Sequence, residues 1–315
     1  MSPAPWRTWT ALGLVYVVWG STYLAIRYVV ESLPPLLTAS ARFLVASALV
    51  IAYLLVRRGL TAFRATPREL ANAAVIGLLL LLGGNGGVTL AEQAHLPSGL
   101  AALLVAGVPL WVVLLRVAAD DRPAGRTVLG VALGFAGLAV LLMPGARPAG
   151  VALGPVLLVL GSSLMWALGS FVASRVALPA DPLLTTVAQM LGGAVGLAVA
   201  GAVRRESPSV SGVRTSSVLA FAYLVVFGSI VAFTAYSWLL GNAPISWVST
   251  YAYVNPVVAV LLGAVFVGEQ VTGTTLVGGL VTVAAVGVVV AEEGRRRRSG
   301  QMPVERQGRA RSSAT

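Results

Sequence analysis

Long apolar blocks run through almost the whole chain, and they limit its fold more than any other feature of the sequence. Most blocks hold about 20 residues, which is the length that an α-helix needs to cross the hydrocarbon core of a bilayer. Inside lipid every backbone amide must be paired, so only helices and closed barrels can span the membrane. The blocks are too long and too continuous for barrel strands. The sequence therefore predicts an all-α integral membrane protein.

The composition also indicates that most of the chain lies in a lipid bilayer. Hydrophobic residues make up 57% of the sequence and charged residues 10%, whereas a soluble domain carries roughly 25% charged residues. Glycine and proline mark most of the joints between the blocks. From these joints we predict ten transmembrane helices, at residues 8–30, 37–56, 69–91, 97–117, 126–143, 151–173, 183–203, 217–240, 245–267 and 273–291.

The arginines indicate how the chain is oriented. Ten crossings place both termini on one side, and thirteen arginines flank the membrane on that side against four on the other. Because cytoplasmic loops carry the excess of basic residues, we expect both termini in the cytoplasm of a bacterial-type inner (plasma) membrane. The loop at 204–216 runs against this rule. Residues 292–315 are predicted to form a disordered basic cytoplasmic tail.

Composition and spacing also exclude several classes of site. The chain has no cysteine and one histidine, His95, which excludes disulfides, thiol catalysis and His-rich zinc sites. There is no Walker A motif, and Gly83–Gly87 lie within a predicted helix and not between a strand and a helix. We therefore expect that the protein is not an enzyme and that it binds no metal and no cofactor. The net charge of +11 comes from arginines in loops and the tail, so we expect no nucleic acid partner.

The chain repeats itself at an offset of 147 residues. The segment P-L-L-T at 35–38 recurs at 182–185, and two later prolines recur at the same spacing. Each copy holds five predicted helices. Because five is odd, the second copy must enter the membrane in the opposite direction. The sequence therefore predicts two five-helix inverted-topology repeats, at residues 8–143 and 151–291.

Inverted repeats are a recurring plan of secondary transporters, because they give two nearly equivalent packings, one open to each side of the membrane. This plan predicts a carrier that moves a small-molecule substrate by alternating access. A passive channel-like facilitator stays open as an alternative. An intramembrane enzyme would need a clustered catalytic set, and here only Glu92 and His95 lie close together in the sequence. The oligomeric state stays open.

Polar residues and helix breaks at membrane depth are the first candidates for a site, because such positions are costly. Asn85 and Thr89 follow a run of glycines in the third predicted helix, where they either line a cavity or clamp two helices together. Pro109 and Pro256 lie in the middle of the fourth and ninth helices, and each removes an amide donor and frees a carbonyl. Such breaks often border a substrate path, although a plain kink is the alternative.

Aromatic and hydroxyl side chains at membrane depth predict a mixed pocket for an amphipathic solute. Some of these side chains instead pack against lipid. The candidates are Trp19, Ser21 and Tyr23 in the first helix, Trp166 and Ser170 in the sixth, Tyr236 in the eighth, and Tyr251, Tyr253 and Asn255 in the ninth.

Two charged residues complete the candidate set. Arg42 can hold a substrate carboxylate through two hydrogen bonds, or it can reach the membrane surface or pair with Glu92. Glu92 lies near the end of the third helix, where it can bind a cationic group or a proton in gating or coupling. Solvation at the interface is the alternative for Glu92. Since the centres of the predicted helices hold no Asp or Glu, the sequence does not argue for proton coupling.

Several segments together carry a family resemblance: W-G-S-T-Y at 19–23, P-P-L-L-T-A-S-A-R-F-L at 34–44, G-N-G-G-V-T-L-A-E at 84–92, P-S-G-L-A-A-L at 97–103 and T-Y-A-Y-V-N-P-V-V-A-V-L-L-G at 250–263. Over residues 8–291 the chain resembles the ten-helix EamA-type members of the drug/metabolite transporter superfamily, and most closely the YedA-like exporters. Gly268-Glu269 before the tenth helix also fits, whereas Asp120-Asp121 is a less clear counterpart in the first repeat.

The resemblance implies a fold, a direction of transport and a place for the site. It implies a central cavity between the two halves, both termini inside, and efflux of amino acids, related metabolites or drugs from the cytoplasm. The shared motifs fall on Trp19, Ser21, Arg42, Asn255 and Pro256. The motifs are specific to the family and do not name one substrate.

Overall fold

The computed structural model describes residues 5–119, 123–142, 151–207, 212–242 and 251–298. The first half holds α1 (Pro5–Val30), α2 (Pro35–Arg58), η1 (Gly59–Phe63), α3 (Pro67–Gly77), η2 (Leu78–Gly86), α4 (Gly87–Gln93), α5 (Ser98–Val105), α6 (Val108–Ala118) and α7 (Gly125–Leu142). The second half holds α8 (Leu153–Ala173), α9 (Pro182–Val203), α10 (Thr215–Tyr223), η3 (Leu224–Val231), α11 (Ala232–Asn242), α13 (Tyr251–Val267) and α14 (Gly273–Arg298).

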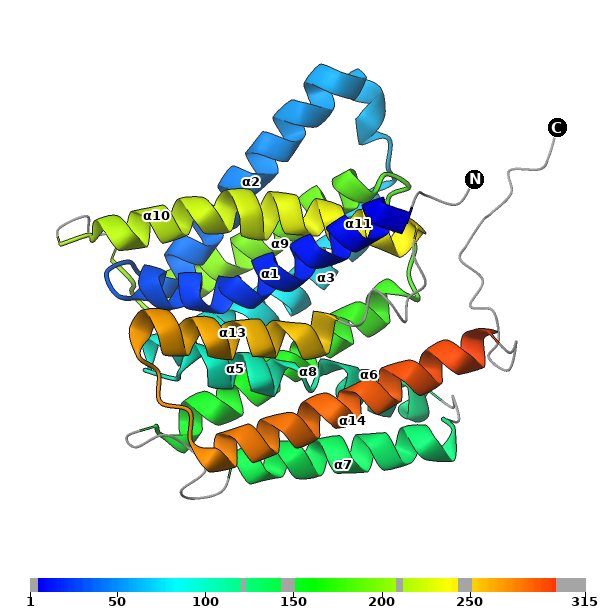
Figure 1. Ribbon diagram of the computed structural model, residues 1–315. Helices are drawn as coiled ribbons and strands as arrows, with labels where there is room; N and C mark the ends of the chain where they lie inside the picture. The colour runs from blue at the N-terminus through cyan, green and yellow to red at the C-terminus, as the bar shows by residue number, and fades with distance from the viewer. Residues whose placement is uncertain (1–4, 120–122, 143–150, 208–211, 243–250, 299–315) are drawn as a thin grey trace.

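These elements form ten apolar rods. Within the described ranges, eight helices are long and apolar enough to cross a membrane, and Gly125–Leu141 and Val254–Val267 form two shorter apolar helices. The π-helical stretches η2 and η3 continue the α-helices on either side of them. Figure 1 shows that α1 begins and α14 ends at the same end of the bundle. We call this the proximal end, and the opposite end, where α1 finishes, the distal end.

The two halves pack as equivalent copies. The α2 helix packs against α9 and α7 against α14, so equivalent helices of the two halves meet. The α1 helix packs against α11 and α13, and its equivalent, α8, packs against η2 and α5. A shift of 147 residues also carries Leu78 at the start of η2 onto Val225 within η3. The predicted all-α membrane fold of ten helices in two inverted five-helix repeats is confirmed.

Glycines allow the two halves to approach closely where α3 meets α9. A Cβ atom on Gly77 would lie 1.9 Å from the carbonyl oxygen of Gln189, and one on Gly192 would lie 2.5 Å from the carbonyl oxygen of Ala74. Small residues at such positions let helix backbones come together, which favours helix association in a membrane. The close contact between α3 and α9 therefore depends on glycine at positions 77 and 192.

Polar bonds join the halves at the distal end. The Glu206 carboxylate accepts hydrogen bonds from the first amides of α2 at 2.9 and 3.0 Å. The Glu269 carboxylate does the same at the start of α5, at 2.7 and 3.1 Å. A carboxylate stabilises a helix start because the first amides there lack helical partners. Ser32 Oγ also donates to Ser217 Oγ at 2.8 Å, so these bonds tie two pairs of segments, each with one member from either half.

The structure differs from the predicted helices in two places. The fourth rod breaks at Ala106 and Gly107, so Pro109 lies in the first turn of α6 and not in the middle of a helix. A missing amide costs no helical bond in that position. The α14 helix continues to Arg298, beyond the predicted end at 291. The rest of the predicted tail, 299–315, lies outside the described residues.

Candidate substrate cavity

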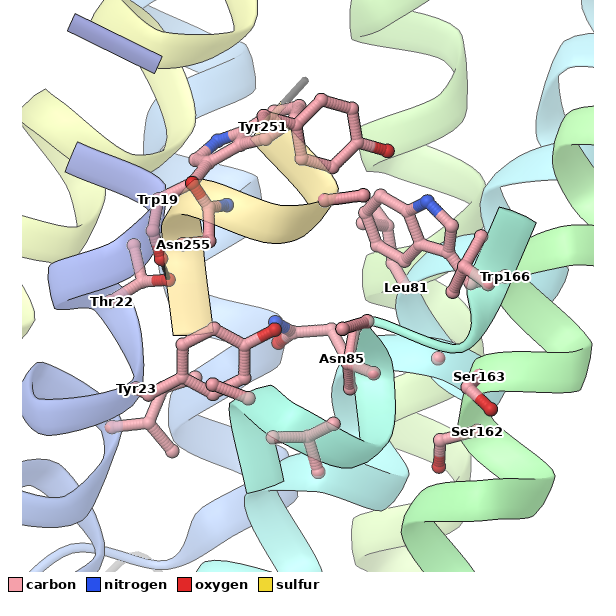
Figure 2. Close-up of a pocket in the computed structure, with 18 of the residues that line it drawn as sticks. Trp19, Thr22, Tyr23, Leu81, Asn85, Ser162, Ser163, Trp166, Tyr251 and Asn255 are labelled. Carbon is pink, nitrogen blue, oxygen red and sulfur yellow. Dashed lines mark hydrogen bonds between the residues drawn. The ribbon is translucent and has the colours of Figure 1, made fainter. Parts of the chain in front are cut away.

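A cavity lies between the two repeats, and side chains of both halves form its wall. Its lining comes from α1, α2, η2, α4, α5, α6, α8, α11 and α13. The structure brings together eight of the residues that the sequence singled out: Trp19, Tyr23, Arg42, Asn85, Trp166, Tyr251, Asn255 and Pro256. Figure 2 shows that Tyr23 and Asn85 point toward one another, whereas Trp19 and Tyr251 lie together at another part of the wall.

An aromatic cluster forms one part of the wall, and Trp19 is its centre. The ring centroid of Trp19 lies 5.0 Å from that of Tyr236, 5.3 Å from that of Tyr251 and 5.6 Å from that of Phe233. The indole Nε1 donates to the carbonyl oxygen of Gly228 at 3.4 Å. Rings at these distances and tilts attract each other beyond the area that they bury. The cluster thus offers a rigid apolar surface.

The α13 helix presents Asn255 and Pro256 to the cavity. Pro256 has no amide hydrogen, so the carbonyl of Ala252, which also lines the cavity, lacks its usual helical donor. The Asn255 side-chain nitrogen, in the orientation that satisfies both contacts, donates to the carbonyl oxygens of Tyr16 and Tyr251 at 3.2 Å. Asn255 therefore joins α13 to α1 next to the aromatic cluster.

Arg42 is the one charged residue among the described residues that line the cavity. Its side chain is 5% exposed, and its Nε donates to Ser229 Oγ at 2.8 Å. The guanidinium carbon lies 4.7 Å from the centroid of the Phe43 ring. The predicted alternative in which Arg42 pairs with Glu92 is wrong for the described state, because both Glu92 carboxylate oxygens lack a hydrogen-bond partner in the described part of the chain.

Asn85 reaches the cavity from η2. Its neighbour Gly84 has no side chain, and a Cβ there would lie 2.9 Å from the Trp166 ring, so η2 and α8 pack closely. The Asn85 Oδ1 atom is buried and accepts no hydrogen bond from a described residue. The Thr89 hydroxyl donates to the backbone carbonyl of Asn85 at 2.9 Å, and Thr89 borders a smaller adjoining hollow instead of the main cavity.

The other predicted site residues lie elsewhere. Ser21 Oγ shares a 2.6 Å hydrogen bond with the Tyr223 hydroxyl, and Ser170 is exposed and donates to the carbonyl of Trp166. Tyr236 reaches the site only through the aromatic cluster. The remaining two are Pro109, which is not among the lining residues, and Tyr253, whose side chain lies outside the described part of the structure.

Glu92 is fully buried and does not line the cavity. Arg27 donates to its backbone carbonyl at 3.1 Å and not to its carboxylate. The predicted alternative of solvation at the interface is wrong for this state, since the side chain is 0% exposed.

Several lining residues were not among those predicted from the sequence. The polar and aromatic ones are Thr22, Phe43, Ser162, Ser163 and Phe233. Helical periodicity was the available signal for three of them, because residues three or four apart share a face. Thr22 lies three residues after Trp19, and the two serines lie four and three residues before Trp166. Ser229, the partner of Arg42, comes from η3 and had no local signal.

Comparison with known proteins shows which protein family the chain resembles over its two halves. The sequence profile described as "EamA-like transporter family" matches residues 8–143 and again residues 153–291. The "Uncharacterized inner membrane transporter YedA" of Escherichia coli (strain K12) is 42% identical over 267 residues, which is 83% of each chain. The "Uncharacterized transporter YvbV" of Bacillus subtilis (strain 168) is 26% identical over 296 residues, 90% of this chain and 91% of that one.

More distant relatives agree with this assignment. The "Probable amino-acid metabolite efflux pump" of Salmonella typhimurium is 24% identical over 87% of this chain and 91% of its own. A solved crystal structure, 20% identical, superposes with a TM-score of 0.63 over 93% of this chain and 99% of that chain, which supports the fold. Since the family profile matches both halves and a relative is 42% identical over most of the chain, the protein is a membrane transporter that belongs to the EamA-like transporter family.

Proposed function

We propose that this transporter is a secondary exporter that carries amino acids, related metabolites or drugs out of the cytoplasm by alternating access. The observation that carries the proposal is the cavity between the repeats, whose wall combines aromatic, amide and guanidinium groups. A mostly apolar pocket with a few polar groups suits an amphipathic solute. The name of the Salmonella relative supports the same substrate class.

In this proposal the two repeats, 8–143 and 151–291, are the bodies that rock against each other. Inverted repeats support two related packings around one fixed site. The bonds made by Glu206, Glu269 and the Ser32–Ser217 pair tie the distal end, so they must break before the cavity opens there. With both termini cytoplasmic, the distal end faces the outside. Glu92, whose buried carboxylate oxygens have no hydrogen-bond partner among the described residues, is the proposed gating or coupling residue.

The proposal is tested by counterflow in proteoliposomes with a panel of labelled amino acids and one cationic dye. For at least one member, the wild type should show exchange that saturates with concentration. Asn255→Ala removes the amide that joins α13 to α1, and exchange should fall roughly tenfold, which corresponds to about 1.4 kcal/mol. The matched control is Gln93→Ala, an exposed amide outside the cavity wall, which should keep the wild-type rate.

The other outcomes of this experiment contradict the proposal. A flux that rises linearly with concentration and shows no counterflow favours a passive channel-like facilitator. Absence of flux for every member of the panel contradicts export of this substrate class. Equal counterflow rates in Asn255→Ala and the wild type would show that the Asn255 side chain on α13 does not contribute to the substrate path.

A further inference from the structure

The buried guanidinium of Arg42 has hydrogen-bonding capacity that the protein leaves unused. An arginine side chain carries five N–H donors and stays charged in proteins. Here Nε donates to Ser229, and neither Nη group forms a hydrogen bond with a described residue. The side chain is nevertheless 95% buried, since its exposed fraction is 5%. The free donors therefore face the inside of the protein and not bulk water.

The chain also supplies no counter-charge to Arg42 among the described residues. No carboxylate of the described chain lies within 4.0 Å of the guanidinium. The described residues that line the cavity include no acid. A buried charge is costly unless it is paired and hydrogen-bonded. An anionic group that enters the cavity from outside the chain would remove this cost.

The guanidinium is also held in place before any ligand arrives. It lies over the ring of Phe43, and Ser229 fixes its Nε. A Cβ on Gly228 would lie 3.1 Å from Nη2, so the absence of a side chain there makes room for the guanidinium. Gly228 and Ser229 both belong to η3. A π-helical stretch is an irregularity found frequently at functional sites. Here η3 positions Arg42, which is the one charged residue among the described residues of the cavity wall.

Asn85 provides the complementary group. Its buried Oδ1 is an acceptor without a partner in the described chain, and an amide oxygen accepts hydrogen bonds from N–H groups. Arg42 and Asn85 line the same cavity and also border the same smaller hollow. Donors for an anion and an acceptor for an N–H group thus lie on one part of the wall, while Trp19 and Tyr251 supply an apolar surface (Figure 2).

We propose that Arg42 binds the carboxylate and Asn85 the ammonium group of a zwitterionic amino acid with an apolar side chain. The inference rests on the proposed function, because it names the substrate of the same cavity. It also predicts which solutes bind poorly in the cavity. A permanently cationic solute would meet a buried positive charge with no described acid in the wall, so cationic drugs are poor substrates.

The test compares three probes that differ at one group each: L-phenylalanine, L-phenylalaninamide and 3-phenylpropionate. Binding to the purified full chain is followed by tryptophan fluorescence, because Trp19 and Trp166 line the cavity. Phenylalanine should bind at least about tenfold more tightly than its amide, which lacks the carboxylate. 3-Phenylpropionate should bind with an affinity between the two, because it keeps the carboxylate and lacks the ammonium group.

Two variants separate the roles of the two residues. Arg42→Gln should weaken phenylalanine and 3-phenylpropionate at least about tenfold. Asn85→Ala should weaken binding of phenylalanine and of its amide, which both carry the ammonium group, and leave binding of 3-phenylpropionate unchanged. Arg68→Gln, which removes an exposed arginine, should bind all three probes as the wild type does. Thermal unfolding shows which variants are folded, and the wild-type comparison of acid and amide needs no variant.

Each remaining outcome overturns the inference. These outcomes are equal binding of phenylalanine and its amide to the wild type, binding of none of the three probes, and unchanged binding of the acids to folded Arg42→Gln. Counterflow distinguishes this failure from failure of the proposed function. If the amide is exchanged as well as the acid, the inference fails and the exporter stands. If the acid binds selectively but no counterflow occurs, the exporter fails and the binding site stands.

Discussion

Among the described residues, Arg42 makes one hydrogen bond, from its Nε to Ser229 Oγ, which makes Ser229 a positioning residue. Ser229→Ala removes that acceptor and frees the guanidinium to turn. We expect KM in counterflow to rise roughly three- to tenfold, the effect of a typical hydrogen bond of about 0.5–1.5 kcal/mol, while the maximal rate changes little. Ser229→Thr keeps the hydroxyl and should restore KM. A lower maximal rate with an unchanged KM would show that Ser229 serves only the packing of η3.

Much of the site could be predicted at this scale, because polar and aromatic side chains are rare at membrane depth and stand out in an apolar sequence. Arg42, Asn85 and Asn255 line the cavity for this reason. The sequence could not tell which member of a motif faces inward. Within W-G-S-T-Y, Thr22 lines the cavity and Ser21 bonds to Tyr223. The two differ because Thr22 lies on the same face of the helix as Trp19 and Ser21 does not.

At the scale of elements, glycines decide how closely the rods pack. Gly77→Ala would place a Cβ 1.9 Å from the backbone oxygen of Gln189, so α3 and α9 must move apart. We expect a loss of roughly 1–3 kcal/mol in stability, seen as a lower midpoint of thermal unfolding in detergent. The matched variant Gly161→Ala has no atom within 4 Å of its new Cβ and should keep the wild-type midpoint. Equal midpoints for the two variants would contradict the close approach.

The elements also show where prediction from sequence ends. Blocks of about 20 apolar residues predict helical rods because lipid leaves few alternatives. The π-helical stretches η2 and η3 and the break at Ala106 and Gly107 had no such signal, because each depends on what the neighbouring helices leave room for. The sequence placed Pro109 in the middle of a helix, yet the break comes before it and makes it the start of α6.

At the scale of the whole molecule, the repeat at 147 residues predicts two similar halves, and the paired contacts of α2 with α9 and of α7 with α14 agree with it. Among the described residues, Glu206, Glu269 and Ser32 make polar bonds that join the halves at the distal end, and at the proximal end Arg58 pairs with Asp181 and Asn72 donates to the carbonyl of Ala177. Alternating access therefore requires that the distal bonds break in every cycle.

Locking the distal end tests this central claim most directly. The chain has no cysteine, and the hydroxyl oxygens of Ser32 and Ser217 lie 2.8 Å apart, so the double variant Ser32→Cys and Ser217→Cys places the only two thiols where a disulfide can form. Counterflow is measured in proteoliposomes before oxidation, after oxidation and after reduction, with Ser32→Cys alone as the control. Alternating access predicts that oxidation abolishes counterflow in the double variant and that reduction restores it. Full counterflow through the cross-linked protein would contradict the account, because the substrate would then cross without opening of the distal end.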